Sequence, residues 1–227
     1  MPHAGELVTQ IRSDLKPLEQ RILNHVYLTT LEAGAVRRTA LGTFAGQQHH
    51  IITSDLRSIA LLVSRHGAQP GRGFLLSTLQ DEAAALDALH TFAGSLGLSI
   101  DDLEAFEPTP AGHAYCAFVA WLALQGSDAE LAGAFLVNFA TWGTNCGRMR
   151  NALTRHYGFA ASELAFFDLF ANLPPLDDEA RAVIQGGLDR GIPARLIHRA
   201  ARMLQGYELM YWDAMAEAAG VQTGQRG

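Results

Sequence analysis

Apolar residues that recur every three to four positions most constrain how this chain can fold. This spacing puts them on one face of an α-helix, and the alternation typical of β-strands is nearly absent. The pattern predicts eight helical segments, at about residues 6–31, 38–65, 74–96, 113–124, 129–157, 162–173, 179–191 and 193–219, with a break or kink before Pro17. We therefore expect an all-α, single-domain, multi-helix bundle over residues 1–227, with a frayed tail after about residue 219.

Composition narrows the classes of partner. The formal net charge of -6 gives no broad attraction to nucleic acid or to an anionic membrane surface, so neither is expected as a partner. No apolar run is long enough for a membrane span, and the N-terminus lacks the apolar core of a secretory signal. The two cysteines, Cys116 and Cys146, fit a reduced cytoplasmic protein better than a disulfide scaffold.

Polar side chains interrupt the apolar faces of four predicted helices. Gln48 and Asp55 lie one heptad apart on the apolar stripe of the second helix, while Asn138 and Glu208 occupy such stripes in the fifth and the last. Tyr115 does the same in the fourth. A buried polar group costs roughly 1–3 kcal/mol when it has no partner. Bundle cores often hold small-molecule sites, so the sequence indicates either a central pocket or scattered core polar groups that are individually satisfied.

No motif of a metal or cofactor site is present. Adjacent helical residues point about 100° apart, so His49 and His50 cannot easily share one metal ion, and at least one should face solvent or a helix interface. No HxxxH or HExxH spacing, dinucleotide-binding GxGxxG, Walker loop or GxSxG elbow occurs. We therefore assign no cofactor and no metal.

Four stretches resemble the TenA/thiaminase II family, which has the heme-oxygenase-like fold. They are "NHVYLTTLEAGAV…LGTFAGQQHHI", "PAGHAYCAFVAWLALQG", "LAGAFLVNFATWG" and, most specifically, "YELMYWDAM". The resemblance implies a central site for an aminopyrimidine, with Glu208 as the family's terminal glutamate and Tyr115 as a pocket tyrosine. It also implies a homo-oligomer, either a dimer or a tetramer.

The chain departs from the family pattern at four positions. Gln48 falls where the family has Asp, Ile51 and Trp142 where it has Tyr, and Asn138 where it has the Cys nucleophile. An amide is not a nucleophile, and Cys146 lies roughly 12 Å further along the helix. Chemistry through a cysteine at position 138 is therefore excluded, although the family has members without the cysteine in which glutamates are thought to assist hydrolysis.

Several functions are compatible with these residues. In the first, the protein hydrolyses a C–N bond of a heteroaromatic, thiamin-related compound: Glu208 is the acid/base, Gln48, Tyr115 and Asn138 orient the ring, and Trp142 or Tyr211 stacks on it. The alternatives are a non-catalytic binder with the same pocket, a di-iron or PqqC-like oxidase of the same fold, and a transcription regulator. The acidic charge and the lack of a helix-turn-helix weigh against the last.

Overall fold

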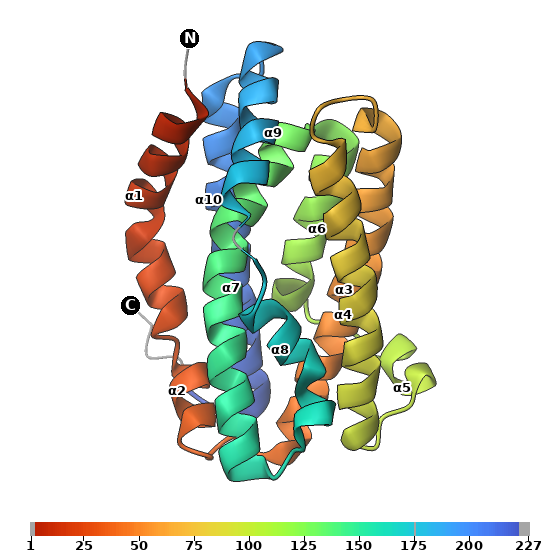
Figure 1. Cartoon of the computed structure of the whole chain (residues 1–227). Coiled ribbons are helices and arrows are strands. Elements are labelled where there is room, and N and C mark those ends of the chain that lie inside the picture. The colour runs from red at the N-terminus through yellow and green to blue at the C-terminus, as the bar shows by residue number, and fades with distance from the viewer. Residues whose placement is uncertain (1–2, 175, 223–227) are drawn as a thin grey trace.

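The computed structural model describes residues 3–174 and 176–222, and these residues form helices with no strand. The predicted all-α bundle is confirmed (Figure 1). The helices run in the order α1 (Ala4–Leu23), α2 (Val26–Glu32), α3 (Arg38–His66), α4 (Arg72–Ser95), α5 (Ile100–Glu104), α6 (Pro110–Gln125), α7 (Asp128–Tyr157), the 3-10 helix η1 (Ala161–Leu164), α8 (Ala165–Ala171), α9 (Asp177–Asp189) and α10 (Ala194–Ala219).

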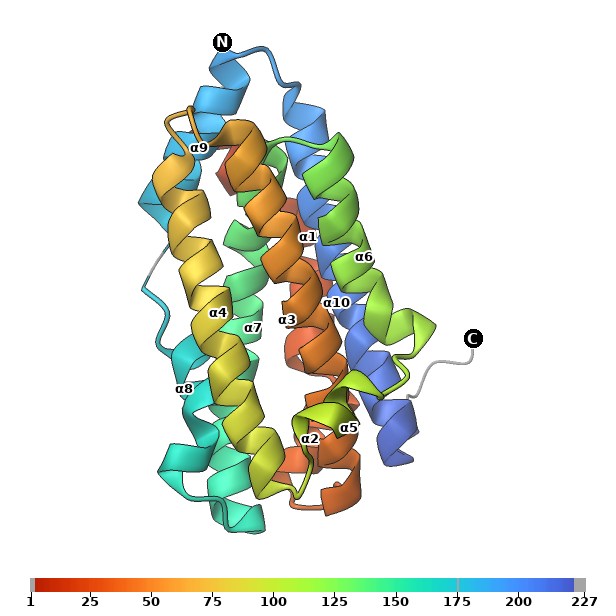
Figure 2. The same ribbon diagram turned by 90° about the vertical axis from the view of Figure 1, so that its right-hand side faces the viewer.

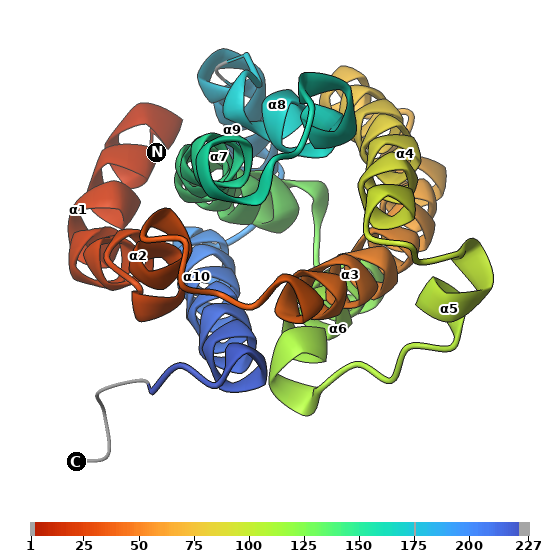
Figure 3. The same ribbon diagram turned by 90° about the horizontal axis from the view of Figure 1, so that it is seen from below.

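The long helices pack around a common axis. α7 and α10 pack extensively against each other, and α3 packs on both α4 and α6. Seen end-on, α4 and α10 lie on opposite sides of the axis, while α3 and α6 close one side (Figure 3). The short α5 lies outside the bundle beside α3 (Figure 2). Side chains from α3, α4, α6, α7 and α10 therefore point toward a shared core.

Local sequence signals set several helix ends. Ser127 caps α7 by accepting a hydrogen bond from the Glu130 amide. α7 ends at Gly158, whose φ of 72° lies in the left-handed region that glycine adopts without strain. Both ends of this 30-residue helix are thus specified locally, which fixes where its polar residues lie along the bundle.

The break expected before Pro17 is absent. α1 continues through Pro17, which is exposed, so its ring and the carbonyl that it leaves without a donor lie on the solvent side. The chain breaks instead after Leu23, and His25 starts α2 by accepting a hydrogen bond from the Tyr27 amide. The single segment expected at residues 6–31 is therefore two helices.

Two expectations concern the tail and the membrane. α10 ends at Ala219, and residues 223–227 of the expected tail lie outside the described residues. None of the described helices combines the length and the apolar content that a membrane span requires.

Candidate functional site

A cavity lies in the core between the long helices. The empty space inside it is about 430 Å³, and this figure includes the part open to solvent. Five helices and α8 contribute its walls. The lining residues are Gln48, Ile51, Ile52, Asp55, Glu82, Tyr115, Asn138, Phe139, Trp142, Phe170, Glu208 and Tyr211.

All six residues assigned to a site from the sequence line this one cavity. They come from four helices that are far apart in the chain: α3, α6, α7 and α10. Each is buried, with between 2 and 9% of its surface exposed. The two amides and the carboxylate at positions 48, 138 and 208 thus face the same space, although their roles in function stay predictions.

A hydrogen-bond chain fixes the polar wall. Tyr115 Oη donates to Asn138 Oδ1 at 2.8 Å, and Asn138 Nδ2 donates to Glu208 Oε2 at 2.7 Å and to Gln205 Oε1 at 3.1 Å. Trp212 Nε1 donates to the other Glu208 oxygen at 3.1 Å. Asn138 therefore does not attack a substrate in this arrangement. Its amide holds the Glu208 carboxyl in one orientation.

The environment of Glu208 favours its neutral form. Only 2% of Glu208 is exposed, and no cation pairs with it among the described residues. Burial raises the pKa of Glu208 to about 8, while the hydrogen bond from Trp212 acts in the opposite direction. A carboxyl with this pKa is largely protonated near neutrality and can both donate and accept a proton.

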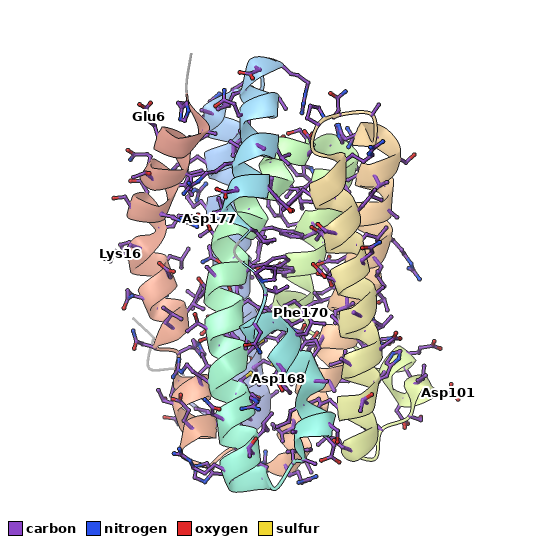
Figure 4. The ribbon with its side chains drawn as sticks, in the orientation of Figure 1. Glu6, Lys16, Asp101, Asp168, Phe170 and Asp177 are labelled. Atoms are coloured by element: carbon purple, nitrogen blue, oxygen red, sulfur yellow. The ribbon has the colours of Figure 1, made fainter. Side chains whose placement is uncertain are left out.

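Apolar side chains form the flat sides of the cavity. Trp142 is stacked parallel to Phe44 behind it, with ring centroids 6.3 Å apart and an interplanar angle of 5°. Tyr211 meets Trp142 edge-on. Phe170 of α8 lies toward the middle of the bundle (Figure 4). Phe139 and Phe170 also line a surface groove beside α7 and α8, so these two rings lie between the cavity and the groove.

Glu82 on α4 lines the cavity although it is not among the residues expected there. Leu75, Thr78, Ala85 and Leu89 define a buried stripe at helical spacing, and Glu82 interrupts that stripe. The pattern that indicates Gln48, a polar residue on an apolar stripe, is therefore also present at Glu82. Burial, followed by repulsion from Asp81, raises the pKa of Glu82 to about 8.

The inward face of α10 is set by its contacts with the cavity wall. Tyr207 is half-buried and packs on Phe118 of α6. Gln205 is fully buried instead, and its amide donates to Thr141 Oγ1 at 3.2 Å. Gln205 and Trp212 both pair with groups of the cavity wall.

Neither cysteine lines the cavity. Cys146 and Cys116 are both fully buried. Burial raises the pKa of Cys146 well above its ordinary value and that of Cys116 to about 12, so both are thiols near neutrality. A cysteine nucleophile is therefore not available to this site.

The histidines lie outside the cavity wall. His49 Nδ1 is 3.4 Å from His90 Nε2 on α4, and His50 Nε2 is 2.7 Å from the carbonyl oxygen of Phe106. Both therefore lie at contacts with neighbouring segments. The described part of the chain contains no group of three or more His, Cys, Asp or Glu side chains placed to hold a metal.

The donor set of the cavity does not fit a heme or a di-iron centre. Heme iron needs an axial ligand such as histidine, and di-iron oxidases of this fold need several histidines and carboxylates. The cavity offers three carboxyls on separate helices and no histidine. The di-iron alternative therefore lacks its ligands among the residues that line the cavity, whereas the PqqC-like alternative stays a prediction.

The bundle and its core cavity define a helical protein of the heme-oxygenase-like fold. The model of the TENA/THI-4/PQQC family matches residues 12–164, and the chain belongs to this family. A comparison with curated proteins found no significant match.

Three solved structures show the same fold. A TenA homologue from P. horikoshii OT3 has a TM-score of 0.76 at 18% identity, over 93% of this chain and 99% of that one. A TenA homologue from Pseudomonas syringae has a TM-score of 0.79 at 14% identity, over 92% of each chain. Heme oxygenase-1 from the cyanobacterium Synechocystis, in complex with heme, has a TM-score of 0.63 at 14% identity, over 94% and 92%.

Proposed function

We propose that the protein binds a small heteroaromatic compound of the aminopyrimidine type, related to thiamin, and hydrolyses one of its C–N bonds. The observation that carries this proposal is Glu208, a buried carboxyl held by Asn138 and Trp212 at the wall of the core cavity, with its pKa raised to about 8. The sequence resemblance to the TenA/thiaminase II family supports the choice of ring.

The cavity can select a flat ring that carries polar groups on its edge. Trp142 and Tyr211 offer aromatic faces and edges for stacking, and Ile51 with Phe139 add apolar contact. Gln48 offers both a donor and an acceptor near the ring edge. Because Gln is neutral, this position does not hold a cationic ring as a carboxylate would.

Glu208 would act twice in each turnover. As the C–N bond of an aminomethylpyrimidine breaks, the neutral carboxyl donates its proton to the leaving amino nitrogen, which departs as ammonia. Water then adds to the carbon, and the Glu208 carboxylate accepts the proton that water loses. The carboxyl returns to its neutral form, so one water is consumed and no other reactant is needed.

The test is turnover of 4-amino-5-aminomethyl-2-methylpyrimidine, followed by ammonia release, and of thiamin, followed by release of its thiazole. Glu208→Gln should lower kcat by about 10²–10⁴-fold, the usual contribution of a general acid/base, and leave binding of the pyrimidine largely intact. The control is Glu217→Gln, an exposed glutamate on the same helix, which should keep full activity. Equal rates for wild type and Glu208→Gln would refute the catalytic role.

One observation favours a non-catalytic binder as the second candidate. Asn138 stands where the family resemblance places the nucleophile, and its amide is committed to hydrogen bonds with Tyr115 and Glu208. A binder would show a rise in melting temperature with pyrimidines and no product over the same range of concentrations.

A further inference from the structure

The cavity has a second acidic region, which the hydrolysis proposed above does not use. Asp55 of α3 and Glu82 of α4 both line the cavity, and only 2% and 5% of their surfaces are exposed. α3 and α4 lie side by side, and α4 is across the bundle axis from the helix that carries Glu208 (Figures 2 and 3). The two carboxyls therefore form a pair distinct from Glu208.

This pair lacks the partners that buried carboxyls usually have. Asp55 Oδ1 is buried and has no hydrogen-bond partner among the described residues. No Arg, Lys or His in the described part of the chain forms an ion pair with Asp55 or Glu82. Buried carboxyls without donors are rare and point to a partner that arrives from outside.

The groups around the pair add no positive charge. Burial and the charge of Glu82 raise the pKa of Asp55 well above its ordinary value. The other titratable groups whose charges act on the pair or are acted on by it are Asp81, Tyr115 and Cys116, which are acidic groups. A cation that enters would therefore meet no positive charge and would displace a proton from the pair.

The geometry points to an amine subsite: Asp55 and Glu82 bind a protonated amine or an amidine group of the ligand, on the α4 side of the cavity. The inference rests on the proposed ligand site. It specifies the class of ligand as a flat ring that carries a basic nitrogen group, placed away from the C–N bond that Glu208 is proposed to hydrolyse. Amidine and ammonium N–H groups donate charge-assisted hydrogen bonds to carboxylates, and the amidine can do so through two parallel bonds. A metal ion fits this pair less well than an amine does. The pair supplies only two side chains, and the described residues contain no group of three or more His, Cys, Asp or Glu side chains that could hold a metal ion.

Two probes of the same size test this subsite without any turnover. Benzamidine is a cation with two parallel N–H groups, and benzamide is its neutral counterpart of nearly equal shape. Isothermal titration calorimetry should show that wild-type protein binds benzamidine roughly tenfold or more tightly than benzamide, as expected for hydrogen bonds to charged groups. Repeating the titration near pH 7 in buffers of different ionisation enthalpy should reveal proton release with benzamidine alone.

Variants then assign the preference to the pair. The double variant Asp55→Asn/Glu82→Gln should lose the preference for benzamidine and its proton release, while its affinity for benzamide stays within about threefold of wild type. The control Asp87→Asn removes an exposed carboxyl from α4 and should change neither affinity. Circular dichroism confirms folding, and the single variants replace the double if it does not fold.

The outcomes separate this inference from the proposed function. Equal binding of the two probes by wild type, binding of neither, or a preference that survives in the double variant would overturn the amine subsite, even if Glu208→Gln abolishes hydrolysis. A benzamidine preference that the double variant loses supports the subsite, even if no pyrimidine is turned over.

Discussion

At the scale of single residues, Tyr115 shows how one hydroxyl organises the site. Its Oη donates to Asn138 Oδ1, and the same amide donates to Glu208 Oε2. Tyr115→Phe removes the hydroxyl and leaves the amide oxygen of Asn138 without that donor. We expect a loss of about 1–3 kcal/mol in the free energy of unfolding, measured by urea denaturation, and a lower turnover because Glu208 is held less firmly.

Tyr207→Phe is the matched control for this change. Tyr207 is half-buried on α10 and packs on Phe118 outside the cavity. Its substitution should leave both stability and turnover near wild-type values. A Tyr115→Phe protein indistinguishable from Tyr207→Phe would show that the hydrogen-bond chain does not order the cavity.

At the scale of helices, the contact between α7 and α8 depends on a glycine. A Cβ atom on Gly143 would lie 2.6 Å from the Phe170 carbonyl oxygen, too close for any side chain. Gly143→Ala should push α8 outward, move the Phe170 ring from the cavity wall and destabilise the protein by about 1–3 kcal/mol. Urea denaturation measures the free energy of unfolding, and the affinity for benzamide, measured by titration, shows whether the shape of the cavity has changed.

Gly206→Ala supplies the opposite case in another long helix. Nothing lies within 4 Å of a Cβ atom at Gly206, which is in the interior of α10. Alanine is favoured over glycine in a helix interior, so this variant should gain about 0.5–1 kcal/mol. A similar gain for Gly143→Ala would show that α8 can move without cost.

At the scale of the whole molecule, the buried carboxyls couple stability to pH. The pKa values of Glu82 and Glu208 are raised from the ordinary 4.5 to about 8. Between these values the unfolded chain loses protons that the folded protein keeps, so the free energy of unfolding falls as pH rises from about 4.5 to about 8 and levels off above that. One pKa unit corresponds to about 1.4 kcal/mol, so we expect each carboxyl to contribute a loss of up to about 5 kcal/mol across this window.

Glu82→Gln/Glu208→Gln should flatten this dependence, while Glu217→Gln should keep it. Melting temperatures at pH 5 and pH 8.5 would show the difference. A wild-type protein that is equally stable at both pH values would mean that water or a neighbouring group solvates the carboxyls. The expected homo-oligomer and the extent of a single domain stay predictions at this scale.

The sequence by itself determined the helical class, the approximate helix limits and the polar positions on apolar faces. These follow from local rules, because periodicity and caps such as Ser127 act within a few residues. Local rules misplaced the break at Pro17, since exposure of a proline depends on what packs around its helix. Glu82 could have been predicted from the same local pattern, because it interrupts a stripe of apolar residues at helical spacing.

Only the tertiary structure decided which polar residues meet. Asn138 and Glu208 are 70 positions apart, and their 2.7 Å contact arises because α7 and α10 pack together. Packing likewise placed Asp55 and Glu82 along the same cavity. It excluded water from both carboxyls, and this burial raised their pKa values. Burial and charge are sums over neighbours from the whole chain, so no single segment of sequence contains them.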